Sequence, residues 1–221
     1  MSEWWTYRLE DFLLFSPRVY WRMFELHNGA FWPLHLVALA AGLAIILLML
    51  RRPQGHGAWI ALFLAAFWIF IGWSFLWDRY AAINWAMAYA VPAFGLEALL
   101  LAIVAARGGL AFDKRDIAGR AGLLLAAIGL VVYPLLPPLF GRPWTEMEAF
   151  GIAPDPTAIA TLGVLLAMSG RLPVLLLPIP LAWLLLSGLT LRTMGDAQGW
   201  LLLLTAGAAI AVLALRCVAR Q

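Results

Sequence analysis

Long uninterrupted runs of apolar residues are the feature that most limits what this 221-residue chain can fold into. A helix of about 20 apolar residues crosses a bilayer core about 30 Å thick, and several runs in the sequence reach that length. Charged residues make up only 12% of the chain and hydrophobic residues 64%, against about 25% and about 45–50% in soluble domains. The sequence therefore excludes a soluble globular enzyme and predicts an all-α, polytopic helical membrane protein.

Seven apolar segments are predicted to cross the membrane, and the fifth of them is unusually short. Its 14 residues reach about 20 Å at ~1.5 Å per residue, less than the thickness of the bilayer core. Two amphipathic segments come first, and we place them in the membrane interface because they are too short to span it. We therefore expect two amphipathic interfacial helices in residues 1–29 and a single seven-span bundle in residues 30–221. The predicted spans are Phe31–Leu50, Ala58–Trp77, Trp85–Ala106, Ala121–Phe140, Pro156–Ser169, Pro173–Leu191 and Gly199–Leu215.

The second interfacial helix carries signals for both of its ends. Ser16 is a good N-cap, and Pro17 suits the first helical position. Asn28 and Gly29 are typical of a helix C-terminus. We therefore predict a short helix that begins at Pro17 and ends at Asn28-Gly29.

The distribution of basic residues predicts how the chain is oriented. Basic residues concentrate in the cytoplasmic loops of membrane proteins. If the fifth segment spans, nine basic residues fall on one side and three in the loops of the other; if it re-enters, the numbers become seven and five. The bias favours seven spans, with the N-terminus outside and the C-terminus in the cytoplasm. Most of the 12 tryptophans then lie near the outer interface, the depth that indole rings favour.

Glu97 is the acidic residue predicted to lie deepest in the membrane, near the middle of the third span. A charged side chain at this depth costs about 2.5–3.5 kcal/mol on insertion scales, so Glu97 should face the bundle interior. Two interpretations stay open. Glu97 is either a proton-relay or cation-binding carboxylate, or a protonated acid that is hydrogen-bonded between helices and holds them together.

The start of the short fifth segment is the second candidate site. In Pro154-Asp155-Pro156-Thr157, Asp155 is a good N-cap and Pro156 suits the first helical position. A short helix would begin below the outer surface, as the discontinuous helices of transporters do at their substrate sites. Thr157 and Thr161 would place two hydroxyl groups beneath that start, near Tyr133 at the end of the fourth span. The alternative is a capped helix in a locally thinned bilayer.

Proline residues interrupt three of the predicted spans. Proline breaks or kinks a helix and leaves backbone carbonyls that need other partners. Such positions would act as hinges, line a polar cavity, or simply fix the packing of the helices. They are Pro92 in the third span, Pro134, Pro137 and Pro138 in the fourth, and Pro178 in the sixth.

Nothing in the sequence indicates a cofactor or a metal centre. The chain has three histidines and one cysteine, Cys217, too few for an intramembrane bis-histidine haem site or a cysteine pair. The single lysine, Lys114, falls in an inner loop and is not available for a retinal Schiff base. Glu146, Glu148 and Asp155 form an acidic outer loop that we expect to be solvated rather than to bind a divalent cation. The net charge of +3 reflects membrane topology and does not indicate a nucleic-acid partner.

Two stretches of the chain resemble a bacterial multi-pass inner-membrane protein family known only as a domain of unknown function. The first stretch holds Trp4-Trp5-Thr6-Tyr7, Phe12–Pro17 and Tyr20-Trp21-Arg22, and the second runs from Gly151 to Gly163. The resemblance implies a bacterial inner-membrane location over nearly the whole chain. It supplies no activity, ligand or catalytic residue.

Two functions are compatible with these features. In the first, the protein is a small-solute or ion transporter or channel in the lipid bilayer. In the second, it is a non-catalytic membrane subunit or assembly factor whose outer aromatic-rich helices dock a partner, either within a complex or in a homo-oligomer. An enzyme is least favoured, because no acid–base–nucleophile set is visible. The residues assigned to the transport site are Glu97, Asp155, Thr157, Thr161 and Tyr133.

Overall fold

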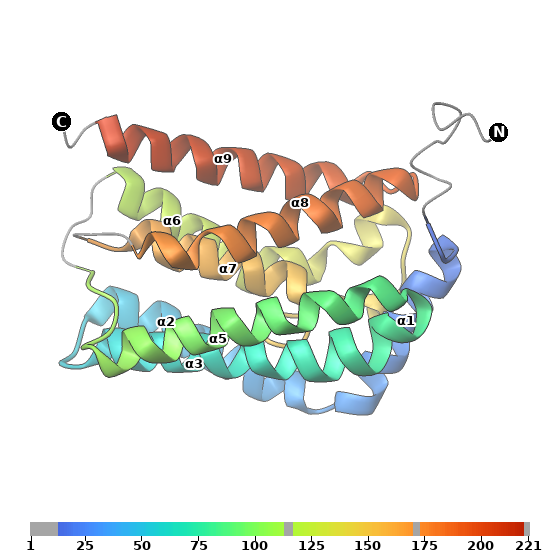
Figure 1. Ribbon diagram of the computed structural model, residues 1–221, viewed down its shortest axis with the longest axis horizontal. Coiled ribbons are helices and arrows are strands. Elements are labelled where there is room, and N and C mark those ends of the chain that lie inside the picture. Colours follow the sequence, from blue (N-terminus) through green and yellow to red (C-terminus); the bar gives the residue numbers. More distant parts are fainter. Residues whose placement is uncertain (1–12, 113–116, 170–172, 219–221) are drawn as a thin grey trace.

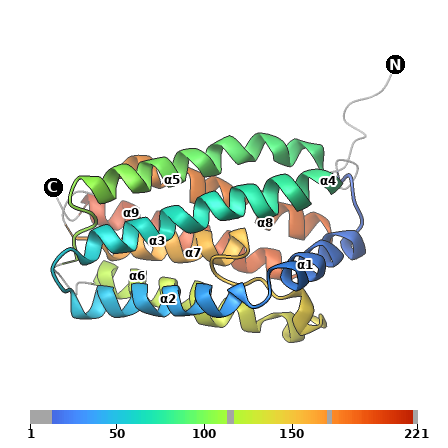
Figure 2. The ribbon, with the colours of Figure 1, turned by 90° about the horizontal axis from the view of Figure 1, so that it is seen from below.

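The helices of this protein lie along one common axis and form a bundle (Figure 1). The structure is a computed structural model that describes residues 13–112, 117–169 and 173–218, and within these ranges it contains helices and no strands. Seen from below, the central helix α7 (Pro154–Ala167) lies between α3 and α6 (Figure 2). The all-α fold class predicted from the sequence is therefore confirmed.

Six helical segments are long and apolar enough to cross a membrane. Short 3₁₀ and π-helical stretches, labelled η, continue several of the α-helices. The third span has the bounds predicted from the sequence, Trp85–Ala106, and the second runs on to Ile83, six residues beyond its predicted end. The segments are α2 (Leu34–Arg51); α3 (His56–Ile71) with η3 (Gly72–Tyr80) and α4 (Ala81–Ile83); η4 (Trp85–Ala90) with α5 (Val91–Ala106); α6 (Ile117–Ala127) with η5 (Ile128–Val132) and η6 (Tyr133–Leu135); η9 (Val174–Leu176) with α8 (Pro178–Thr193); and α9 (Gln198–Val218).

The fifth of the seven predicted spans, Pro156–Ser169, is not one of these six long helices. The helix α7 has 14 residues, and every one of them is buried. It contacts α3, α6, α8 and α9, so it forms the centre of the bundle and has no face on the bundle surface. The chain before it includes η7 (Pro137–Phe140) and η8 (Trp144–Glu146), which fold at the end of the bundle near α1, so α7 occupies only the remaining length.

The C-terminal end of α7 is fixed by groups from two other segments. The Arg216 guanidinium of α9 donates hydrogen bonds to the carbonyl oxygens of Leu166 (3.0 Å) and Met168. The backbone N–H of Ser169 donates to the carbonyl oxygen of Ala111 at 2.7 Å. These bonds satisfy backbone groups at a helix end that is buried away from water. The chain therefore runs from one end of the bundle to the other through this segment.

The close contact of α6 and α7 depends on glycine. A Cβ atom added to Gly163 would lie 2.3 Å from the backbone nitrogen of Ala126, and one added to Gly122 would lie 2.4 Å from that of Ala167. Small residues let helix backbones approach in this way, which is a common means of helix association in membranes.

The amphipathic helix α1 (Pro17–Phe31) begins as predicted and ends later than predicted. The Ser16 hydroxyl accepts a hydrogen bond from the backbone N–H of Val19 at 3.4 Å, which confirms the N-cap. The helix continues past Asn28-Gly29 to Phe31. The Asn28 side-chain amide does not cap the helix and instead donates to the carbonyl oxygens of Thr145 and Met147, each at 2.8 Å. The other predicted interfacial helix lies largely outside the described residues.

His27 makes the attachment of α1 dependent on pH. Its side chain is fully buried, and Nε2 donates to the carbonyl oxygen of Ile152 at 3.2 Å. Burial lowers the pKa of His27 from 6.5 to about 4, so between these values the unfolded chain binds a proton that the native protein does not. Stability should therefore fall as the pH drops from 6.5 toward 4, by up to about 3 kcal/mol.

The variant His27→Gln tests this pH dependence, because the glutamine amide can replace the Nε2 donor without titrating. The free energy of unfolding in detergent, measured from pH 4 to pH 7, should fall more steeply toward acid in the wild type than in the variant. Parallel curves would show that His27 does not carry the effect.

Candidate functional site

A buried carboxylate at the start of α7 is the centre of the candidate site. Asp155 is 1% exposed and is the second residue of the helix, so the predicted N-cap role of Asp155 is wrong: Ala153 holds that position and the helix begins at Pro154. Its Oδ1 accepts a hydrogen bond from Nε1 of Trp183 at 2.7 Å. Its Oδ2 accepts from the hydroxyl groups of Ser187 at 2.8 Å and Tyr133 at 3.2 Å. Three side-chain donors from two different spans thus converge on one carboxylate.

The hydrogen-bond network continues from Asp155 toward the end of the bundle near α1. The Gln198 side-chain nitrogen donates to the Tyr133 hydroxyl at 2.7 Å and to Oε1 of Glu148 at 2.9 Å. The Gln198 side-chain oxygen accepts a hydrogen bond from the guanidinium of Arg142. That guanidinium lies 3.4 Å from the ring centre of Trp21 on α1, a cation–π contact. We call this set the carboxyl cluster: Tyr133, Arg142, Glu148, Asp155, Trp183, Ser187 and Gln198.

The charges in the carboxyl cluster favour one bound proton. Glu148 is 2% exposed, and its Oε2 has no hydrogen-bond partner among the described residues. Burial, followed by the nearby carboxylate of Asp155, raises the pKa of Glu148, while Arg142 opposes the shift. Two carboxyl groups and one guanidinium share this site, so a proton held by the Glu148–Asp155 pair leaves it without net charge.

Thr157 and Thr161 support the helix start and offer no free hydroxyl group. The Thr157 hydroxyl accepts from the backbone N–H of Gly151 and donates to the carbonyl oxygen of Ala153, both at 2.8 Å. The Thr161 hydroxyl donates to the carbonyl oxygen of Thr157 at 2.8 Å and accepts from Nε1 of Trp68 at 3.0 Å. The two residues therefore lie on one side of α7 as predicted, and they hold the chain that positions Asp155.

Glu97 is separate from the carboxyl cluster. Its side chain is fully buried, and neither carboxyl oxygen has a hydrogen-bond partner among the described residues. Phe94, one turn earlier on α5, packs between Trp68 and Trp183 at ring-centre distances of 4.6 and 5.1 Å. This aromatic layer joins Trp68 on α3 to the tryptophan that binds Asp155. An isolated buried carboxyl group is most stable as the neutral acid.

The prolines predicted as kinks or hinges mark places where the helix type changes. Pro92 and Pro178 lie at the first or second positions of α5 and α8, where the missing N–H leaves no carbonyl unpaired. Pro134, Pro137 and Pro138 lie in the 3₁₀ turns that follow the π-helix η5. This irregular stretch holds the Tyr133 side chain in the core, 1% exposed.

The sequence predicted part of this site and missed the rest. The structure brings the predicted residues Asp155 and Tyr133 into contact. The expectation that the acidic outer loop is solvated is wrong for Glu148 and Asp155, because the loop folds into the bundle and buries them. Among the described residues, no group of three or more His, Cys, Asp or Glu side chains is placed to hold a metal ion. The members that the sequence interpretation did not assign to the site are Arg142, Glu148, Trp183, Ser187 and Gln198.

Comparison with known proteins matches the chain to one family. Residues 17–221 match DUF6064, described as a family of unknown function. Neither the curated proteins nor the solved structures contain a significant match to this chain. The chemistry of the site is therefore interpreted from its own geometry.

Proposed function

The chain belongs to this family of unknown function, and from the carboxyl cluster we propose that it is a bacterial inner-membrane transport protein that moves a small solute or ion in step with a proton. The proton-binding group is the Glu148–Asp155 pair. The observation that carries the proposal is that this pair is buried with a single guanidinium, so that one proton balances its charge.

The surface of the bundle supports its placement in a membrane. Large apolar side chains remain exposed along the spans, among them Leu36, Leu99 and Leu204, each between 56% and 68% exposed. In water such a surface would promote aggregation, whereas lipid tails solvate it. In the part of the chain that the structure describes, six helices also have the length and composition needed to cross a membrane.

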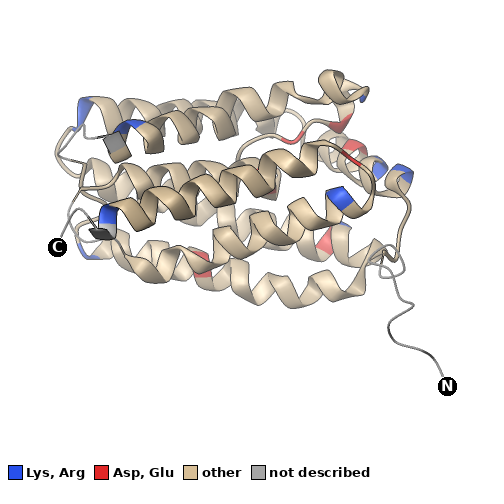
Figure 3. Ribbon diagram, turned by 90° about the horizontal axis from the view of Figure 1, so that it is seen from above, with Lys and Arg blue, Asp and Glu red and all other residues tan. Residues whose placement is uncertain are grey.

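The charges at the two ends of the bundle support an orientation with the C-terminus in the cytoplasm. Figure 3 shows basic residues at both ends and the acidic residues mostly toward the end where the chain begins. Arg51, Arg107 and Arg216 lie at the other end, and the sequence assigns nine basic residues to that side against three in the loops of the side near α1, as expected if that side faces the cytoplasm. Exposed tryptophans mark the end near α1 as the outer interface. They are Trp32, Trp77, Trp85, Trp144 and Trp200.

The position of the carboxyl cluster suits a group that takes up a proton from outside. Gln198 is the first residue of α9, and Ser187 lies six residues before the outer end of α8. The cluster therefore reaches from the outer end to about two helical turns inside the bundle. The contact of Arg142 with Trp21 links it to α1. A shift of α1 away from Arg142 would open the pair to water, and the reverse shift would close it.

A pH-jump experiment tests the proposal without knowledge of the transported solute. Proteoliposomes adsorbed on a solid-supported membrane would be exposed to a rapid change in pH, and the resulting charge displacement recorded. We expect a transient current in the wild type, because a proton moves into a site within the membrane. The variants Asp155→Asn and Glu148→Gln should each lose most of this current, since the pair can no longer exchange a proton.

Two further variants make the result specific. Asp78→Asn changes an exposed acid near the outer end and should leave the current unchanged. Glu97→Gln distinguishes the two buried acids: a retained current assigns proton binding to the carboxyl cluster alone, and a lost current extends the path to the middle of the membrane. A wild-type current that survives in the double variant of Asp155 and Glu148 would contradict the proposal.

The alternative, a docking subunit, gains no support from the described part of α1. Its aromatic side chains Tyr20, Trp21 and Phe24 are buried against the bundle and are not exposed to a partner. We therefore propose no second function.

A further inference from the structure

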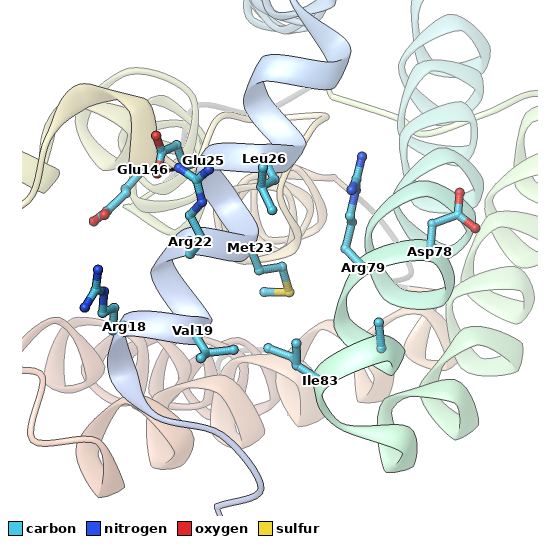
Figure 4. Close-up of a pocket in the computed structure, with 11 residues that line it drawn as sticks. Arg18, Val19, Arg22, Met23, Glu25, Leu26, Asp78, Arg79, Ile83 and Glu146 are labelled. Carbon is cyan, nitrogen blue, oxygen red and sulfur yellow. Dashed lines mark ion pairs between the residues drawn. The ribbon is translucent and has the colours of Figure 1, made fainter.

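A pocket of about 690 Å³ lies at the outer end of the bundle, apart from the carboxyl cluster. It is formed by α1 on one side and by η3 and α4 on the other, with one residue from η8 (Figure 4). None of the proposed proton-binding groups lines it. The side chains that line it include Val19, Arg22, Met23, Glu25, Arg79 and Glu146.

The elements that form this pocket carry exposed tryptophans, which place it at the depth of the lipid headgroups. Trp77 is two residues before Arg79, Trp85 is two residues after Ile83 at the end of α4, and Trp144 is two residues before Glu146. Each is more than half exposed. Indole rings favour the boundary between headgroups and acyl chains. The inference thus rests on the membrane placement proposed above, and it is independent of proton transport.

The lining of the pocket combines charges of both signs with an apolar floor. Arg22 and Glu25 form an ion pair at 2.5 Å, and both side chains are at least one-third exposed. Figure 4 shows Arg79 across the pocket from this pair, with Met23 between them, and Glu146 on the same side as Glu25. In the same view Asp78 points away from the other lining residues. Val19 is 43% exposed at the edge.

From this arrangement we propose that the pocket binds the headgroup of a zwitterionic phospholipid whose phosphate is linked to a primary ammonium group. The arginines Arg22 and Arg79 bind the phosphate through charge-assisted hydrogen bonds. Glu25 and Glu146 bind the ammonium, and Val19 and Met23 contact the start of an acyl chain. A purely anionic headgroup would place its charge beside two carboxylates, so the mixed lining selects against it.

Native mass spectrometry of the detergent-solubilised protein tests this site, with phosphatidylethanolamine as the probe and phosphatidylglycerol as the anionic comparison. We expect the wild type to retain more phosphatidylethanolamine than phosphatidylglycerol at equal added concentration. Arg79→Ala should weaken phosphatidylethanolamine binding by about tenfold, because a charge-assisted contact to the phosphate is lost. The matched control is Arg51→Ala, which removes an exposed arginine at the opposite end of the bundle and should change binding little.

The acidic side of the pocket has its own test. The double variant Glu25→Gln and Glu146→Gln should lose the preference for phosphatidylethanolamine and bind phosphatidylglycerol equally or better, whereas Asp78→Asn should keep it. A wild type that prefers phosphatidylglycerol would overturn the zwitterionic assignment. Equal affinity for soluble glycerophosphoethanolamine would overturn the assignment to a lipid. If Arg79→Ala loses the lipid but keeps the pH-jump current, the lipid site stands apart from the proposed transport function.

Discussion

Replacing Gly163 with alanine is expected to destabilise the protein by about 3 kcal/mol or more, although alanine is the better helix former. The added Cβ would lie 2.3 Å from the nitrogen of Ala126 and 2.7 Å from the carbonyl oxygen of Gly122. Both are backbone atoms of α6 and cannot rotate away, so the two helices would have to separate. Because α7 is buried on every side, that movement would loosen its contacts with the surrounding helices as well.

Gly207→Ala on α9 provides a control of opposite sign. A Cβ at Gly207 meets no heavy atom within 4 Å, so only the gain in helix propensity remains, about 0.5–1 kcal/mol. The free energy of unfolding of both variants would be measured by denaturant titration in the same detergent. A Gly163→Ala variant as stable as the wild type would show that α6 and α7 do not approach as closely as described.

The positions of the six long helices, and the ends of one of them, could be predicted from the sequence because they depend on local properties. Apolar runs set the spans, and the third has the predicted bounds, Trp85–Ala106. Ser16-Pro17 and Asp155-Pro156 carry helix-start chemistry that does not depend on the rest of the fold. Ser16-Pro17 starts α1 as predicted, whereas α7 begins two residues earlier than predicted, with Ala153 in place of Asp155 as the N-cap. These features require no knowledge of which helices become neighbours.

The burial of the acidic loop could not be predicted in this way. Glu148 lies in a polar stretch between two apolar segments, a pattern typical of an exposed loop. It is buried because the loop is bound from outside its own sequence, by the Asn28 side chain of α1 and by Gln198 of α9. Contacts of this kind depend on the packing of helices that are far apart in the chain.

Part of the carboxyl cluster left a signal in the sequence that could have been used. Trp183 and Ser187 are four residues apart in an apolar span and therefore share one helix face. A hydrogen-bonding pair on one face of such a span indicates a buried polar partner. Glu97 shows the opposite limit: its position inside an apolar span was apparent from the sequence, but not that its carboxyl oxygens would have no hydrogen-bond partner among the described residues.

Replacing Asp155 with alanine is expected to cost about 3–5 kcal/mol of folding stability, a large share of the roughly 5–15 kcal/mol of an ordinary protein. The change leaves the Trp183 N–H and the Ser187 and Tyr133 hydroxyl groups without their acceptor. A buried donor that loses its partner costs about 1–3 kcal/mol. The loss also removes one of the two carboxyl groups that balance the buried guanidinium of Arg142.

Asp155→Asn separates the structural role of this residue from its charge. The asparagine keeps an acceptor for the Trp183 N–H, and the two hydroxyl groups can turn to accept from its amide, so we expect a loss of only about 1–2 kcal/mol. Unfolding titrations in detergent should therefore rank the wild type above Asp155→Asn and Asp155→Asn well above Asp155→Ala. Asp78→Ala, an exposed control, should change stability by less than about 0.5 kcal/mol. If Asp155→Ala matched this control, the three hydrogen bonds would not hold α7 in place, and the carboxylate would be free to serve proton exchange alone.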